Sequence, residues 1–132
     1  MRRIFVDVSR LVASAHRKAL ADYFDFRTDF ADDPLIAMKK HGTKGVEAQL
    51  ILRYLEQLTR ILDKGSYPDN LPSFKNAVEE IKETCQDKIE RAEISQVGAG
   101  AIYRAIMEAE LKATEKVLET MQLVTRYLNE IA

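Results

Sequence analysis

Apolar residues recur along most of this chain at the three- and four-residue spacings of amphipathic helices. The first stripe predicts a helix over residues 3–26, whose apolar side carries Ile4, Val8, Leu11, Val12, Ala15, Ala19, Tyr23 and Phe26. Asp33 and Pro34 are typical of a helix start, because aspartate caps free amide groups and proline fits the first helical position. We therefore expect a short helix over residues 34–41, ended by Gly42.

Three further stripes follow. A helix that begins at Thr43 or Gly45 and ends at Gly65 is apolar over about half its circumference, which predicts the most buried helix of the chain. After a turn-rich connector over residues 66–72, a narrow stripe resembles a coiled-coil seam and consists of Phe74, Val78, Ile81, Cys85, Ile89 and Ala92. Residues 95–100 interrupt the pattern. The last helix carries Ile102, Ile106, Ala109, Ala113, Val117, Met121, Val124, Leu128 and Ile131 on one face.

These elements predict an all-α fold. We expect residues 1–132 to form a single-domain, mostly antiparallel four-helix bundle with one extra short helix, since the connectors between the long helices are short. No segment alternates with the two-residue period of a half-buried strand. With 132 residues, of which 46% are hydrophobic and 31% charged, the chain is long enough for one core and too short for two.

Composition limits the environment and the chemistry. The formal net charge of −1 argues against a protein that coats nucleic acid through bulk charge. The single cysteine, Cys85, cannot form an intramolecular disulfide, and no apolar run is long enough for a membrane span, so we expect a cytoplasmic protein. The aspartates of residues 22–33 lack the spacing of a calcium loop, and neither histidine lies in a Glu-x-x-His motif. We expect no metal and no cofactor.

Charge is nevertheless distributed unevenly. Residues 1–66 hold 12 basic and 9 acidic residues, a net +3, whereas residues 67–132 hold 8 and 12, a net −4. The basic stretch over residues 39–45 precedes a predicted helix, whose free amide groups favour anions. One interpretation is a contact to phosphate or nucleic acid, and the other is a solvated loop and helix face. The candidate contact residues are Arg2, Arg3, Arg10, Arg17, Lys18, Lys39, Lys40 and Lys44.

Aspartates alternate with aromatic residues over residues 22–34. The aspartates can cap helix ends, while the aromatic side chains exceed what one loop can bury, so this segment is also a candidate loop for binding a protein partner. Three leucines lie off the main apolar stripes and are further candidates for such a surface. The predicted partner-binding residues are Tyr23, Phe24, Phe26, Phe30, Leu52, Leu111 and Leu118.

Catalytic groups are sparse. His16, Tyr103 and Glu110 are the residues around which an enzyme could be built, and Glu110 falls near the apolar side of the last helix, yet no spacing places the three within hydrogen-bond reach. We therefore expect a non-enzymatic interaction module: an adaptor, accessory or regulatory subunit that binds a protein partner or forms a homo-oligomer. The alternative is a small nucleic-acid-binding accessory subunit that uses a basic face.

Overall fold

The computed structural model describes residues 2–34, 36, 44–95 and 101–131. Its four long helices are α1 (Arg2–Asp32), α3 (Lys44–Lys64), α4 (Leu71–Ser95) and α5 (Ala101–Asn129). No strand occurs among the described residues, so the prediction of an all-α fold is confirmed. The short helix expected over residues 34–41 falls largely on positions outside the described residues.

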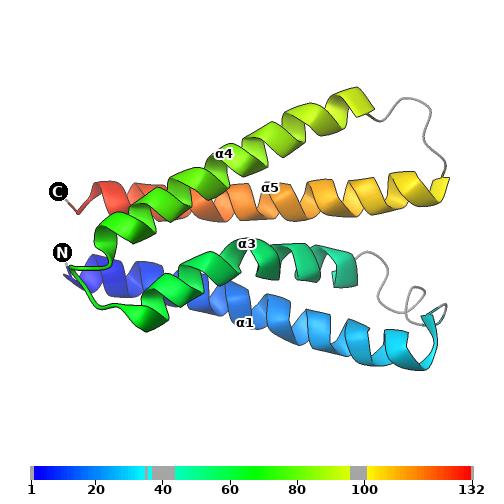
Figure 1. Ribbon diagram of the computed structural model, residues 1–132, viewed down its shortest axis with the longest axis horizontal. Helices are drawn as coiled ribbons and strands as arrows, with labels where there is room; N and C mark the ends of the chain where they lie inside the picture. The colour runs from blue at the N-terminus through cyan, green and yellow to red at the C-terminus, as the bar shows by residue number, and fades with distance from the viewer. Residues whose placement is uncertain (1, 35, 37–43, 96–100, 132) are drawn as a thin grey trace.

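Successive long helices run in opposite directions, and the two ends of the chain lie at the same end of the molecule (Figure 1). α1 packs along α3 and α4 along α5, while contacts between α3 and α5 join the two pairs. This arrangement brings α1, α3 and α5 around a common space.

α1 is longer than the apolar stripe predicts. It continues past residue 26 to Asp32, so the expectation of an acidic aromatic loop at Tyr23–Phe30 is wrong: this segment is helical. No glycine or proline interrupts it, and the amide of Asp33 donates to the carbonyl of Asp29 at 2.9 Å. Pro34 has no amide hydrogen and restricts the residue before it, which explains why α1 ends here.

The ends of the other helices follow the expected local chemistry. The Asp33 carboxylate accepts a hydrogen bond from the amide of Ile36 at 3.3 Å, which is the capping contact predicted for this residue. α3 ends at Lys64, directly before Gly65, as expected. The Asn70 carbonyl accepts the amide of Phe74 at 3.0 Å, which closes the first turn of α4. α5 has 29 residues, close to the length that its stripe predicts.

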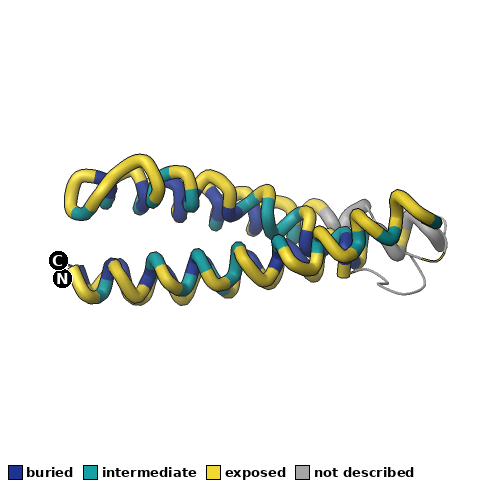
Figure 2. Tube along the Cα trace, turned by 90° about the horizontal axis from the view of Figure 1, so that it is seen from below, coloured by how far each residue is buried: buried dark blue, intermediate teal, exposed yellow. Residues whose placement is uncertain are grey.

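One hydrophobic cluster draws side chains from all four helices, and Figure 2 shows the buried residues along the facing sides of the helices. The predicted stripe of α4 is buried from Phe74 to Cys85, and that of α5 from Ala109 to Leu128. The predicted stripe of α1 does not include Phe5, yet this residue is buried. Its ring lies 5.2 Å from that of Tyr67 and 5.5 Å from that of Phe74.

α5 contributes more fully buried residues than α3, but α5 is the longer helix and α3 has the smaller share of exposed residues among those described, so the expectation that α3 is the most buried helix stays a prediction. The apolar face of α3 is broad, and its flanking residues Val46, Leu50 and Leu62 are only half-buried. A narrow stripe, as on α5, can be fully covered by its neighbours, whereas the edges of a broad stripe remain at the surface.

Candidate functional site

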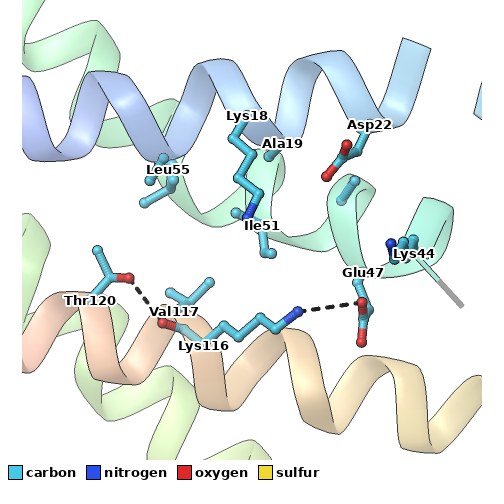
Figure 3. A pocket seen from close by; sticks show the side chains of 12 residues that line it. Lys18, Ala19, Asp22, Lys44, Glu47, Ile51, Leu55, Lys116, Val117 and Thr120 are labelled. Carbon is cyan, nitrogen blue, oxygen red and sulfur yellow. Dashed lines mark hydrogen bonds and ion pairs between the residues drawn. The ribbon is translucent and has the colours of Figure 1, made fainter. Parts of the chain in front are cut away.

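A cavity of about 360 Å³ opens between α1, α3 and α5 (Figure 3). Apolar side chains form its floor: Ala15, Ala19, Ala48, Ile51, Leu55 and Val117. Polar and charged side chains complete the lining: Lys18, Asp22, Lys44, Glu47, Lys116 and Thr120. Its volume lies at the lower end of the range of about 300–1,000 Å³ that is usual for small-molecule sites.

Small residues explain why space remains here. Ala15 and Ala19 lie one turn apart on α1, and Ala48 belongs to the facing side of α3. Protein interiors are normally filled at close-packed density, and an alanine on an apolar stripe leaves the volume that a leucine would occupy. The cavity therefore follows from three alanines on the faces where α1 and α3 approach α5.

The charged side chains of the lining come from all three helices. Figure 3 shows Lys18, Asp22 and Glu47 pointing into the space beside α5. Glu47 lies in the first turn of α3, where the helix dipole favours a negative charge, and only 7% of its surface is exposed. The Lys116 Nζ atom lies 3.6 Å from Glu47 Oε2, so this lysine of α5 compensates the charge of the buried carboxylate.

Two of the predicted anion-binding residues meet at this cavity. Lys18 of α1 and Lys44 of α3, 26 positions apart in sequence, both line it. Arg10 and Arg17 are exposed on α1 and do not belong to the lining, and the Arg17 Nε donates to the Ala13 carbonyl at 3.5 Å. Arg2 and Arg3 are exposed in the first turn of α1. Lys39 and Lys40 lie outside the described residues.

The four aromatic residues near the end of α1 divide into two pairs. Phe24 and Phe30 face outward, with 54% and 44% of their surfaces exposed. Tyr23 and Phe26 are half-buried and face α3. The Phe26 ring lies so close to Gly45 that a Cβ atom there would overlap it, and its centroid is 5.5 Å from that of Phe30.

Tyr23 also lines a second groove between α1 and α3, of about 340 Å³, which contains the predicted partner-binding residue Leu52 and the histidine His16. The other two leucines lie on α5. Leu111 is half-buried, and Leu118 packs against the hydrophobic core. The structure therefore brings Tyr23 and Leu52 together, while Leu118 contributes part of its surface to packing within the chain.

The residues considered for catalysis do not form a described site. His16 lies in the groove between α1 and α3. Glu110 is exposed, although the sequence places it near the apolar side of the last helix, and its backbone carbonyl accepts a hydrogen bond from the Thr114 hydroxyl at 2.7 Å. The side chain of Tyr103 lies outside the described residues. Within the described ranges, no three histidine, cysteine, aspartate or glutamate side chains cluster closely enough to hold a metal ion.

Cys85 lies in the core beside Tyr54 and Lys88. Desolvation raises the pKa of its thiol to about 11, although the Lys88 ammonium and the Tyr54 hydroxyl act in the opposite direction. The Lys88 Nζ also lies 5.4 Å from the centroid of the Tyr54 ring. A buried, neutral thiol is a poor nucleophile, so this cysteine acts as a small apolar core residue, as its place on the stripe indicates.

Sequence reasoning missed Glu47 and Lys116. A signal for Glu47 was present, because it shares a helical face with Ile51, Leu55 and Leu58, where a carboxylate needs a partner. Lys116 carries no such signal, since it is a lysine on an exposed helix edge with 60% of its side chain exposed.

No protein-family model, curated protein or solved structure matches the chain. None of the described helices is both long enough and apolar enough to span a membrane. A function therefore has to be inferred from the surfaces and the cavity of the chain itself.

Proposed function

We propose that this protein is a non-enzymatic helical interaction module, which binds a protein partner or a second copy of itself through the distal end of α1. We define the distal end by Phe24 and Phe30 of α1 together with Ile36, which follows α1 in the chain. For this proposal the fold is taken as a single-domain antiparallel four-helix bundle with a short extra helix. The cytoplasm is taken as its location, because the only cysteine is unpaired and buried.

The exposure of large apolar side chains at the distal end carries the proposal. Ile36 is 59% exposed and Phe24 is 54% exposed. Phe24 and Phe30 are six positions apart, which separates them by about 120° around a helix. Apolar surface is thus presented on more than one side of α1, and such surface is stabilised when a partner removes it from water.

The arrangement favours a partner that packs around the end of α1 rather than one that covers a single flat face. Aromatic residues dominate the energetics of many protein interfaces, since each removes a large area from water at low entropic cost. The aspartates between them, including Asp25 and Asp32, are exposed and would form a polar rim. The helix itself provides a rigid support for both sets of side chains.

Solution mass tests the proposal. We would measure it by light scattering after size exclusion for the wild type, Phe24→Asp, Phe30→Asp and the double variant. Leu123→Asp is the matched control, because Leu123 is an exposed apolar residue on α5, outside the distal end. We expect an assembly that both phenylalanine variants weaken and the control leaves intact, with helicity by circular dichroism unchanged in all.

Other outcomes are equally informative. An assembly that only Leu123→Asp disrupts would contradict the proposed surface, and a wild-type monomer would exclude self-association and leave a different protein as the partner. Lys18 and Lys44 share the cavity but Arg10 and Arg17 do not line it, so binding of nucleic acid stays a prediction from the sequence. The absorbance ratio of the purified protein, measured in the same experiment, tests that alternative.

A further inference from the structure

We propose that the cavity between α1, α3 and α5 is a binding site for a small organic anion with an apolar body, such as a medium-chain carboxylate. This inference is independent of the interaction surface at the distal end of α1. It rests on the shape of the cavity, the chemistry of its floor and the balance of charge in its lining.

The floor determines the apolar part of the ligand. Ile51, Leu55 and Val117 present aliphatic side chains, and the alanines beside them leave the space open. Replacing water on such a surface with an alkyl chain is favourable, and the favourable free energy grows in proportion to the apolar area that is covered. A purely inorganic anion would leave this part of the cavity unused.

The charged residues of the lining determine the sign of the charge that the ligand carries. Lys116 is paired with Glu47, so these two charges largely cancel. Lys18, Lys44 and Asp22 remain, and the described structure gives none of them an ion-pair or hydrogen-bond partner. Two ammonium groups against one carboxylate leave a surplus of positive charge at the mouth. The first turn of α3, at Lys44 and Glu47, adds the positive end of a helix dipole on the same side.

The geometry therefore orients the ligand. Its carboxylate lies at the mouth between the ammonium groups of Lys18 and Lys44, which come from two different helices, and its alkyl chain follows Ile51 and Leu55 toward the core. Glu47 stays paired with Lys116, so the deeper part of the cavity offers no free positive charge to a second anionic group. Selectivity then depends on both ends of the ligand, since neither a short anion nor an alkyl cation satisfies both.

Binding of octanoate, below the concentration at which it forms micelles, tests the proposal. We would measure affinity by calorimetry and map the contact by amide chemical shifts in nuclear magnetic resonance. Octylamine has the same chain length and the opposite charge, and acetate has the same charge without the chain. We expect octanoate to bind more tightly than either and to shift the amides around Lys18, Lys44 and Val117. Equal or tighter binding of octylamine or acetate would overturn the assignment.

Variants separate the two parts of the site. Lys18→Met and Lys44→Met keep the aliphatic stem of each side chain, and each should weaken octanoate binding by about threefold to fivefold, as expected for partly exposed ion pairs. Glu47→Gln leaves the Lys116 ammonium without its ion-pair partner and should strengthen binding. Lys112→Met is the matched control, because Lys112 is exposed on α5 outside the lining, and it should leave the affinity unchanged.

A filled cavity gives the last control. Ala15→Leu places a larger apolar side chain in the floor and should abolish octanoate binding while the melting temperature stays the same or rises. An unchanged or higher melting temperature shows that the variant is folded, so a loss of binding cannot then be attributed to unfolding. If Ala15→Leu and the two lysine variants all bind octanoate like the wild type, the ligand does not occupy this cavity and the proposal is wrong.

Discussion

The contact between Phe26 and Gly45 allows a sharp test of how α1 and α3 pack. The Phe26 ring lies over the backbone of Gly45, in the first turn of α3, where a Cβ atom would overlap three atoms of the ring. Gly45→Ala therefore forces the ring or the helices to move. The prediction is that this substitution destabilises the protein, although alanine is ordinarily the better residue in a helix.

Two opposing contributions give the magnitude. Replacing glycine with alanine in a helix stabilises by up to about 1 kcal/mol. Inserting a methyl group where none fits costs about 1–3 kcal/mol, and the overlap here is with a ring rather than with the end of a flexible chain. We therefore expect Gly45→Ala to lower the free energy of unfolding by about 1–2 kcal/mol.

Urea unfolding followed by far-ultraviolet circular dichroism measures this change, with Phe26→Ala as the second background. Once the ring is removed, only the helix-propensity contribution remains, so Gly45→Ala should become stabilising in Phe26→Ala protein. The reversal of sign corresponds to a coupling of about 2–3 kcal/mol between the two positions, within the range for residues in contact. If Gly45→Ala stabilises the wild type, or costs the same in both backgrounds, the ring does not lie over Gly45.

Three further predictions concern the stability of the protein. Burial raises the pKa of the Cys85 thiol from 9.0 to about 11. The contribution of the neutral thiol to the free energy of unfolding is therefore complete below pH 9 and is lost as the pH rises toward 11. In urea unfolding, the free energy of Cys85→Ala should decline less steeply over this interval than that of the wild type. Phe74→Ala should cost about 3–5 kcal/mol and Leu123→Ala less than about 0.5 kcal/mol, because the first side chain is fully buried and the second is exposed. Lys82→Met should cost about 1 kcal/mol in thermal unfolding, because Lys82 Nζ donates to the Thr125 hydroxyl across α4 and α5 at 3.3 Å, and an unchanged melting temperature would contradict this bridging role.

The stripes of α4 and α5 could be predicted from sequence because burial there depends on one helix face at a time. Phe74, Val78 and Ile81 follow one another at spacings of four and three residues, and all three are buried. The end of α3 was also predictable, because Gly65 alone decides it. Local periodicity and local capping chemistry are enough for such features.

The end of α1 was harder to predict because two local signals conflict there. Aspartate favours caps and turns, and several aspartates between residues 22 and 33 suggested a loop. The segment is helical because Phe26 packs onto α3 and no residue before Pro34 interrupts the helical hydrogen bonds. Packing against a neighbouring helix is not visible in a single segment of sequence, and it decided the structure.

The cavity lies beyond sequence reasoning for a different reason. Ala15 and Ala48 are ordinary members of apolar stripes, and Lys44 and Lys116 are ordinary exposed lysines. Their common location depends on how α1, α3 and α5 pack together, which involves residues more than a hundred positions apart in the chain. The charge pattern did mark Lys18 and Lys44 as candidate anion contacts, and Glu47 carried a signal as a charged residue on an apolar face, but neither observation places these residues together.

The two proposed sites are separate, yet they share α1 and the junction between Phe26 and Gly45. Lys18 and Asp22 line the cavity, and the distal end begins at Phe24, within one turn of Asp22. A ligand that draws Lys18 toward Lys44 acts on the same two helices that meet at this junction. Linkage then sets a strict condition: if octanoate changes the association constant of the protein by some factor, association must change the octanoate affinity by that same factor. Measuring both quantities shows whether the junction couples the sites, because unequal factors are thermodynamically forbidden and two factors of one mean that the coupling free energy between the sites is zero.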